Sequence, residues 1–231
     1  MPKLLDLFCG AGGAAMGYHR AGFEVVGVDH KPQPNFPFEF HQADALEYIA
    51  EHGHKFDMIH ASPPCQIYSV TSSLSTGDHP ALIKPVRAAL QAVGRPYVIE
   101  NVPGAPLKNP LMLCGTMFGL QVIRHRLFET SPIIWWPPTQ CQHIGRASSA
   151  GRGGKNGYLP GTLKNFAYIT VCGNDYIADD GRRAMGIDWM TKRELSQAIP
   201  PAYTKWIGEW MIEYLAHLTS GCNRPRCRGS L

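Results

Sequence analysis

Residues 61–69, ASPPCQIYS, carry one thiol on a stiff stretch of chain. Two prolines run directly into Cys65, and proline is rare inside a buried strand or helix, so we expect this cysteine on a loop. A thiolate is a soft nucleophile whose pKa depends strongly on its surroundings. The segment is therefore consistent with a half-buried structural thiol or with a nucleophile presented for chemistry.

A carboxyl group later in the chain is spaced so that it could act together with this thiol. Cys65 follows the apolar run FDMIHA (56–61), and Glu100 lies near the end of the run PYVIEN (96–101). If the two runs are parallel strands of one doubly wound sheet, both residues lie at the carboxyl edge, where such sheets bind ligands. A thiol and a carboxyl group on neighbouring strand ends can meet over one substrate.

Two guanidinium groups follow in VIRHRLFE (122–129). If this segment is extended, Arg124 and Arg126 project to the same face. There they would hold a phosphate or raise the thiolate fraction of Cys65.

A glycine-rich turn follows the first apolar run, in FCGAGGAA (8–15), and a helix start follows the turn. Such a turn brings backbone amides close to a ligand, and the helix N-terminus favours electronegative groups. The next apolar run ends at Asp29, whose carboxylate can accept both hydroxyls of a ribose. The glycines are spaced GxGG rather than GxGxxG, and no Walker lysine is present, so the pattern indicates a nucleoside-containing cofactor other than a dinucleotide or triphosphate. Asp44, at the start of the next helical stretch, is either a helix cap or a contact to an adenine amino group.

The elements that must position these residues alternate along the first hundred residues. Strands are predicted at 3–8, 24–29, 56–61 and 96–101, and helices at 13–22, 44–53 and 79–94. Alternation of this kind requires right-handed crossovers and a mostly parallel sheet. The predicted fold class is thus α/β, with a Rossmann-like sheet and helices on both faces.

The amino-acid composition changes after Trp136: residues 137–165 are rich in Gly, Ser and basic side chains and show no periodicity. We expect a small loop-rich lobe there. From Thr191 the chain is helical in pattern, interrupted at Pro200 and Pro201. The predicted divisions are a catalytic and cofactor-binding domain at 1–131, a reduced target-recognition lobe at 132–183, a helical segment returning to the first domain at 184–218, and a disordered tail at 219–231.

Charge and composition limit the class of protein. The chain has 231 residues, 44% hydrophobic and 17% charged, with a net charge of only +4. No acidic residue occurs from Thr130 to Asn174, a span that contains Arg146, Arg152 and Lys155. This local basic field suits either a solvated loop or a polyanionic partner. Seven irregularly spaced cysteines, no signal-peptide pattern and no membrane-length apolar run favour a reducing cytoplasmic setting, such as a bacterial or phage-infected cell.

A metal is not expected. Cys141 and His143 form a CQH pair, but zinc would need Cys172 or the tail cysteines Cys222 and Cys227 as further ligands. No other finger-like spacing is present, and Cys114 is expected to be a packing residue.

Four motifs together resemble those of a known family. DLFCGAGG, SPPCQ, ENV and RHRLFE occur in the order found in DNA cytosine-5 methyltransferases, and AIPPAYTKWIG (198–208) is similar to that family's last motif. The resemblance covers roughly residues 3–130 and 185–210, and a compact phage-like or orphan member is indicated. It implies S-adenosyl-L-methionine as cofactor and double-stranded DNA as substrate, with a monomeric protein that does not bind a membrane.

The resemblance also implies roles for individual residues. Cys65 would attack C6 of a flipped-out cytosine and form a covalent adduct, while Glu100 would hold N3 and the exocyclic amine. Arg124 and Arg126 would position the base or its phosphate. The implied cofactor-binding residues are Phe8, Gly10, Gly12, Gly13, Asp29, Asp44 and Pro64. The implied substrate-binding residues are Pro64, Gln66, Ser69, Asn101, Arg146, Arg152 and Lys155.

Departures from the family pattern bear on specificity. Asp29 replaces the usual glutamate, Val122 stands where a glutamine is usual, and Gln197 replaces an asparagine. The stretch between the arginine motif and the last motif is short, so few side chains can reach base edges. We expect a short or loose recognition sequence. An RNA (tRNA) cytosine-5 methyltransferase and a catalytically inactive DNA-binding regulatory homologue are the alternatives.

Overall fold

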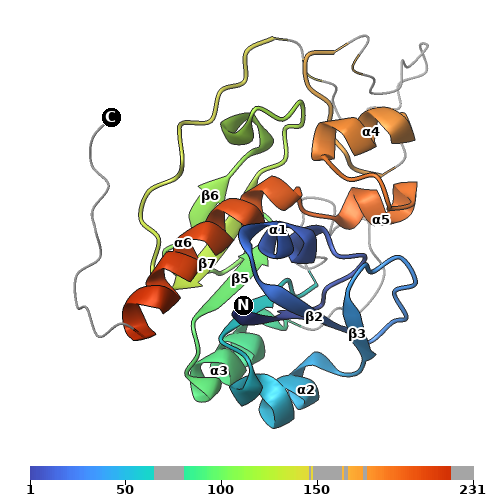
Figure 1. The fold of residues 1–231 in the computed structure, drawn as a ribbon. Helices are drawn as coiled ribbons and strands as arrows, with labels where there is room; N and C mark the ends of the chain where they lie inside the picture. The colour runs from blue at the N-terminus through green and yellow to red at the C-terminus, as the bar shows by residue number, and fades with distance from the viewer. Residues whose placement is uncertain (65–80, 146, 148–162, 164–165, 174–175, 220–231) are drawn as a thin grey trace.

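A seven-stranded sheet forms the centre of the computed structural model, in the order β3-β2-β1-β4-β5-β7-β6 (Figure 1). The structure describes residues 1–64, 81–145, 147, 163, 166–173 and 176–219. The first five strands in this order pair in parallel, whereas β7 is antiparallel to both β5 and β6. The strands are β1 (Lys3–Leu7), β2 (Glu24–Asp29), β3 (Glu39–Gln42), β4 (Met58–Ala61), β5 (Tyr97–Asn101), β6 (Leu111–Leu113) and β7 (Arg126–Ser131).

Helices cover both faces of the sheet, because successive strand residues point to opposite sides. Leu4 belongs to the core under α1 and α6, whereas the adjacent Leu5 belongs to the core under α2 and α3 (Figure 1). The helices are α1 (Gly13–Ala21), α2 (Ala45–His52), α3 (Ile83–Val93), α4 (Ala178–Met185), α5 (Lys192–Gln197) and α6 (Pro201–Thr219), with short 3₁₀ turns η1 (Gly53–Lys55) and η3 (Gly115–Phe118).

The two helices α1 and α6 come from opposite ends of the described chain and lie side by side. Glycines allow this close approach. A Cβ on Gly17 would lie 2.0 Å from Oγ1 of Thr204, and one on Gly208 would lie 2.8 Å from the Cβ of Ala21. Thr204 also donates a hydrogen bond of 2.8 Å to the Ala14 carbonyl oxygen. The C-terminal helix is thus locked onto the helix that follows the first strand.

The α/β fold predicted from the sequence is confirmed. The four predicted strands and three predicted helices of the first hundred residues are present with small shifts at their ends, and the helical pattern after Thr191 resolves into α5 and α6. The sequence prediction missed β3, β6 and α4. It also left open whether residues 122–129 are extended; β7 begins within them, at Arg126.

A third apolar cluster lies beyond the sheet, mostly among residues 122–195. Ile169, Val171, Tyr176, Met185 and Leu195 are all buried in it. The two tryptophans of the run IIWW (133–136) do not belong to this cluster, because the exposed fractions of Trp135 and Trp136 are 67% and 81%.

No helix within the described ranges is both long and apolar enough to cross a bilayer.

Candidate functional site

A cavity of about 370 Å³ opens at the carboxyl ends of β1, β2, β4 and β5. It is at the lower end of the size range of small-molecule sites. This edge of the sheet is where doubly wound folds bind ligands, because the loops there diverge at the change of strand order. Its lining includes Phe8, Gly10, Asp29, Pro64, Glu100 and Arg126, all predicted from the sequence.

The turn after β1 is bent sharply around one wall of the cavity. Phe8 has φ 60°, a left-handed conformation that costs a non-glycine residue on the order of 1–3 kcal/mol. Gly10 follows with φ 49°, and its backbone N–H donates a hydrogen bond of 3.1 Å to Oδ2 of Asp29. The glycine turn and the acid at the end of β2 therefore form one unit, as their spacing predicted.

Asp29 retains hydrogen-bonding capacity toward the cavity. Its Oδ1 accepts a hydrogen bond of 3.0 Å from the backbone N–H of Lys31 and lies 3.2 Å from Nδ1 of His30. An ionised carboxylate offers about four acceptor positions, so the backbone bonds leave room for ligand hydroxyls.

Asp6 is a second carboxyl group in the cavity wall, and the sequence prediction missed it. It is fully buried in β1, and neither of its oxygens has a hydrogen-bond partner among the described residues. Burial, reinforced by the nearby charge of Asp29, raises the pKa of Asp6 well above its usual value. An unsatisfied buried carboxyl group favours a ligand that donates hydrogen bonds.

Glu100 and Arg126 meet at the other side of the same cavity. Nε of Arg126 lies 3.1 Å from Oε1 of Glu100, and the pair is almost fully buried. Burial raises the pKa of Glu100, although Arg126 and a hydrogen bond from Ser62 pull it back. Glu100 therefore keeps its proton to a higher pH than an exposed glutamate does, which suits a group that donates a proton to a ligand.

A chain of hydrogen bonds runs behind Glu100. The Tyr18 hydroxyl lies 2.9 Å from Nδ1 of His60, and Nε2 of His60 lies 2.9 Å from the Ser62 hydroxyl, which bonds Glu100. Burial lowers the pKa of His60 to about 3, so this ring is neutral at physiological pH.

Arg124 is oriented differently from what the sequence predicted. Its Nη1 donates to the Val171 carbonyl oxygen at 2.6 Å and its Nη2 to the Ser196 carbonyl oxygen at 2.8 Å. Burial, with a contribution from Arg126, lowers the pKa of this guanidinium group to about 10. Arg124 lines the cavity, but its two terminal nitrogens tie the backbone of three segments together.

Hydrogen bonds from two neighbouring strands hold Ser62 and Pro63, which precede Cys65 in the chain. The Ser62 N–H donates to the Leu7 carbonyl oxygen at 3.2 Å, and the Asn101 side chain donates to the Pro63 carbonyl oxygen at 2.9 Å. Asn101 is buried, and its Oδ1 accepts from the N–H of Val102. Asn101 is thus engaged with the proline segment, rather than open to a substrate as the sequence suggested.

Three residues that were predicted to bind the cofactor have structural roles in the fold. Gly12 is the N-cap of α1 and does not line the cavity. Asp44 does not line it either, and its Oδ1 caps α2 through the N–H groups of Leu46 and Glu47. Gly13 lines the cavity, but it is needed there because a Cβ would lie 2.6 Å from the carbonyl oxygen of Ile199.

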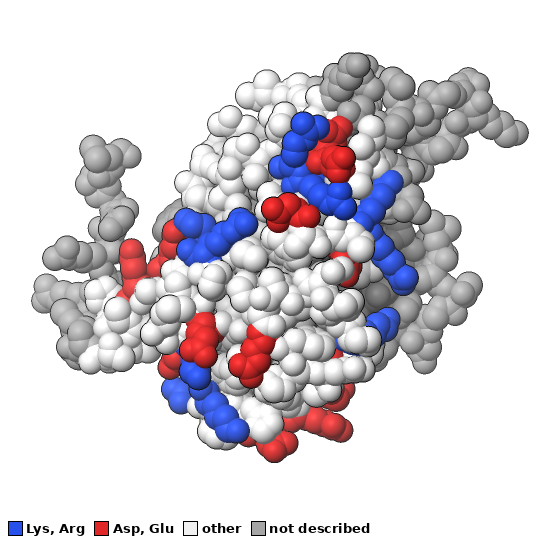
Figure 2. Space-filling view, turned by 45° about the vertical axis from the view of Figure 1, so that its right-hand side comes forward, with Lys and Arg blue, Asp and Glu red and all other residues white. Residues whose placement is uncertain are grey.

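Several predicted site residues lie outside the described residues: Cys65, Gln66, Ser69, Arg146, Arg152 and Lys155. Figure 2 shows one face of the molecule, on which the basic and acidic side chains of the described residues are interspersed.

The last wall of the cavity comes from the C-terminal part of the chain. Ser196, Gln197, Ala198 and Ile199 line it just before α6, within and next to the motif singled out in the sequence. Glu194 was missed; it lines the cavity and accepts hydrogen bonds from the Asn35 amide at 3.0 and 3.1 Å.

Four side chains of metal-ligating types form a group in the structure. Cys141 and His143 lie together with Cys114 and His125, not with Cys172. Only the Cys141 and His143 pair is recognisable in the sequence, because Cys114 and His125 come from separated segments with irregular spacing.

Comparison with known proteins relates this geometry to a family. The family model for C-5 cytosine-specific DNA methylases matches residues 2–107. Type II methyltransferase M.HgiGI of Herpetosiphon aurantiacus is 34% identical over 88 residues, which cover 32% of this chain and 68% of that protein. Type II methyltransferase M.FnuDI of Fusobacterium nucleatum is 31% identical over 112 residues, covering 44% of this chain and 33% of that protein.

The matches span between 33% and 49% of the length of three longer curated relatives. Among solved structures, a candidate DNA modification methyltransferase encoded within a prophage of E. coli has a TM-score of 0.62 at 16% identity, covering 94% of this chain and all (100%) of that one. S. pombe Dnmt2 methyltransferase also has a TM-score of 0.62, at 13% identity, covering 93% of this chain and 99% of that one. At these identities the solved structures establish the fold.

Proposed function

Because this chain belongs to the C-5 cytosine-specific DNA methylase family, we propose that it transfers a methyl group from S-adenosyl-L-methionine to C5 of cytosine in DNA. The observation that carries the proposal is the shared cavity. One wall holds the glycine turn and Asp29, and the other holds the buried pair of Glu100 and Arg126. A nucleoside cofactor and a base can thus meet in one cavity.

The cavity residues fit S-adenosyl-L-methionine, which supplies the methyl group when bound. This cofactor is rich in hydrogen-bond donors, with two ribose hydroxyls, an ammonium group and an adenine amino group. Asp29 can accept from the hydroxyls, and the unsatisfied carboxyl group of Asp6 suits another donor. Phe8 offers an apolar ring surface at the strained turn, and Pro64 borders the same space.

Glu100 would bind the Watson–Crick edge of a cytosine that has been flipped out of the duplex. Its raised pKa favours a proton on the carboxyl group, which can be donated to N3 of the ring. The other oxygen can accept from the exocyclic amine. Arg126 holds the carboxyl group in place and stabilises negative charge as the proton moves to N3.

Cys65 would be the nucleophile, on the basis of its motif. Its thiolate forms a bond from Sγ to C6 of cytosine, and the C5–C6 π electrons make C5 nucleophilic while N3 gains the proton from Glu100. Once C5 carries the methyl group, a water molecule removes the C5 proton. Those electrons re-form the C5–C6 double bond and expel the Cys65 thiolate, and N3 returns its proton to Glu100.

Asn101 and Arg124 would support this chemistry by positioning other parts of the site. Asn101 tethers the Pro63 carbonyl oxygen two residues before the nucleophile, so it would set the direction of the proline segment. Arg124 would keep the cavity closed by joining the backbone at Val171 and Ser196. Both are positioning residues in this proposal.

We further propose that the protein acts as a monomer on double-stranded DNA, with residues 1–131 as catalytic domain and 132–183 as target-recognition lobe. The basic residues Arg146, Arg152 and Lys155 would contact phosphates, which gives salt-sensitive binding without base readout. Gln66 and Ser69, next to the nucleophile, would contact the flipped base.

Covalent trapping tests the proposal directly. DNA that contains 5-fluorocytosine cannot lose a proton from C5, so incubation with the protein and S-adenosyl-L-methionine should leave a denaturation-resistant complex. The complex should form with the wild-type chain and with Cys172→Ser, and should be absent with Cys65→Ser. Trapping on a tRNA pool that contains 5-fluorocytosine, and on no DNA, would replace the DNA proposal with an RNA one. Absence of trapping on either would overturn an enzymatic function.

A further inference from the structure

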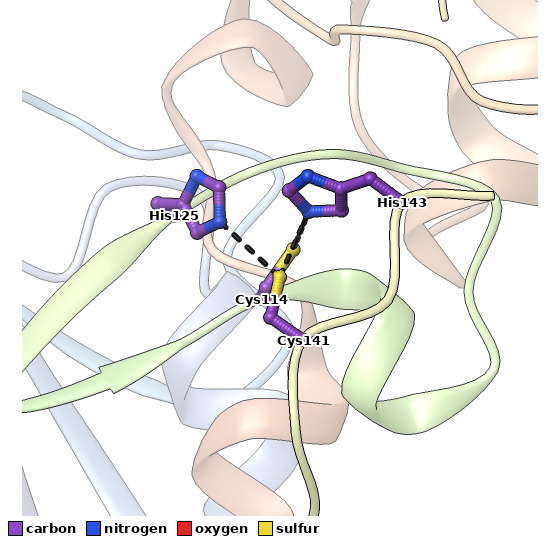
Figure 3. A group of neighbouring side chains, drawn as sticks. All are labelled: Cys114, His125, Cys141 and His143. Atoms are coloured by element: carbon purple, nitrogen blue, oxygen red, sulfur yellow. Dashed lines mark hydrogen bonds between the residues drawn. The ribbon is translucent and has the colours of Figure 1, made fainter. Parts of the chain in front are cut away.

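Four side chains of metal-ligating types gather beside the sheet (Figure 3), and none of them lines the cavity. One ligand atom from each of Cys114, His125, Cys141 and His143 lies within 4.8 Å of all the others. They come from three places in the chain: the residue after β6, the residue before β7, and the connection that follows β7.

The distances suit a tetrahedral ion. Zinc binds cysteine sulfur at about 2.3 Å and histidine nitrogen at about 2.0–2.1 Å, so the ligand atoms of a tetrahedral site are roughly 3.3–3.8 Å apart. Nε2 of His143 lies 3.4 Å from Sγ of Cys114, and Nε2 of His125 lies 3.4 Å from Sγ of Cys141. The 2.8 Å separation between Cys141 and His143 is shorter and requires only a rotation of the exposed His143 ring.

The surroundings resemble those of a structural metal site. Cys114 is buried, Cys141 and His125 are half-buried, and His143 is exposed. Thr116 lies behind both sulfur atoms, with its hydroxyl 3.5 Å from Cys114 Sγ and 3.6 Å from Cys141 Sγ. The N–H of Gln142 donates to the same hydroxyl at 3.2 Å, so the outer contacts orient the ligands.

We propose that these four residues bind one Zn²⁺ ion. Two thiolates and two imidazoles form a Cys₂His₂ set, which zinc prefers, and four protein ligands leave no position for substrate. The ion therefore has a structural role. Both cysteines are free thiols in the structure, as zinc binding requires.

The ion fixes the loop that presents the catalytic arginine, a consequence that rests on the function proposed above. His125 lies between Arg124 and Arg126, and its carbonyl oxygen accepts a hydrogen bond of 2.8 Å from Nη1 of Arg126. Holding the His125 ring thus steadies the backbone from which Arg126 reaches Glu100. The ion also joins residues 141–143, in the proposed recognition lobe, to the strand pair β6 and β7.

Metal content is the direct test. The full chain, purified under reducing conditions without chelator, should contain one zinc per chain by mass spectrometry of the metal. X-ray absorption should give a shell of two sulfur and two nitrogen atoms. Replacement by Co²⁺ should produce sulfur-to-cobalt charge-transfer absorption and the visible bands of a tetrahedral ion.

Variants assign the ligands. Cys141→Ser and His143→Ala lie at partly or fully exposed positions and should fold, with zinc affinity lowered about 10-fold or more. Cys172→Ser removes a thiol outside the group and should retain one zinc. A chelator should lower the melting temperature of the wild type and of Cys172→Ser, and lower that of Cys141→Ser much less.

These readouts use neither DNA nor cofactor, so the metal site and the proposed methyl transfer can fail independently. A chain without stoichiometric zinc under reducing conditions overturns the proposal. So does a disulfide between Cys114 and Cys141 in thiol counting, or zinc retained in full by both ligand variants.

Discussion

At the scale of single residues, the buried pair of Glu100 and Arg126 carries the proposed chemistry. Burial raises the pKa of the carboxyl group more than Arg126 and Ser62 lower it, so Glu100 holds its proton to a higher pH than an exposed glutamate does. Both side chains line the cavity at the sheet edge where the sequence predicted a site. The geometry differs from the prediction for Arg124, whose nitrogens bond backbone carbonyl groups.

Replacing Glu100 by glutamine should separate chemistry from cofactor binding. The amide cannot donate a titratable proton to N3, so we expect kcat to fall by about 10²–10⁴-fold. The affinity for S-adenosyl-L-methionine, measured by calorimetry, should change less than about 10-fold, because Asp29 and the glycine turn are untouched. Glu209→Gln, on the exposed ion pair of α6, is the matched control and should keep the wild-type kcat. A fully active Glu100→Gln enzyme would contradict the assigned role.

His60 should make stability depend on pH. The folded-state pKa is about 3, whereas an unfolded histidine titrates near 6.5, so the unfolded state binds the extra proton between these values. The free energy of unfolding should therefore fall as pH drops below about 6.5, by at most ~1.4 kcal/mol per pH unit from this residue.

The measurement is urea unfolding between pH 7 and pH 4. His60→Gln should be less stable at pH 7, because the bonds to Tyr18 and Ser62 are disturbed, but its stability should fall less steeply with acid. The same substitution at the exposed His54 should leave the wild-type slope in place. An unchanged slope in His60→Gln would show that other groups carry the acid sensitivity.

At the scale of elements, the packing of α6 on α1 determines whether the cavity has its last wall. Residues 196–199 line the cavity immediately before α6, and Gly13 meets the Ile199 backbone there. The helix therefore contributes to ligand binding through the segment that it anchors.

Gly17→Ala tests this connection. The new Cβ would lie 2.0 Å from Thr204 Oγ1 and 2.2 Å from the Pro201 carbonyl oxygen, so one helix must shift. We expect a loss of about 1–3 kcal/mol in the free energy of unfolding and weaker cofactor binding. Gly119→Ala is the control: its φ of 69° strains the new residue, but nothing lies within 4 Å of the Cβ. It should cost stability without weakening cofactor binding, and equal cofactor affinities in the two variants would contradict the link.

The elements that the sequence predicted are those with a strong internal pattern. Apolar runs such as EVVGVD (24–29) become parallel strands buried on both faces, which composition alone reveals. The missed strand β3 is a short edge strand, EFHQ, with one apolar residue and no buried position. The missed strand β6 has three residues and depends on pairing with β7, which no local pattern records.

The difference between local pattern and tertiary pairing also explains which site residues could be predicted from the sequence. The glycine turn, Asp29, Glu100 and Arg126 lie at or next to strand ends, so finding the strands located them at one edge. Asp6 was missed because it is a polar residue inside a buried strand, where its environment depends on tertiary packing. Cys114 and His125 were missed as metal-ligand candidates because antiparallel pairing of β6 with β7 brings them together.

At the scale of the whole molecule, the sheet that carries the proposed active site has seven strands, whereas the proposed recognition lobe at 132–183 is small. Its described part has an apolar cluster around Ile169 and Tyr176 and is tied to the sheet through Arg124 and the proposed metal site. A lobe of this size can hold the enzyme on DNA through phosphates more easily than it can read many bases.

The size of the lobe predicts a short or loose recognition sequence. Each base pair read in the major groove needs a side chain positioned within hydrogen-bonding distance of its edge, and a good bidentate contact is worth about 1–3 kcal/mol of discrimination. Few such contacts fit here, so most binding energy would come from phosphates and decrease steeply with salt. Bisulfite sequencing of plasmid methylated by the purified chain should reveal at most about four fixed base pairs around each modified cytosine. Plasmid incubated with the Cys65→Ser variant provides the background. Six or more fixed base pairs would mean that the lobe reads DNA far more fully than its length allows, or that a partner chain completes it.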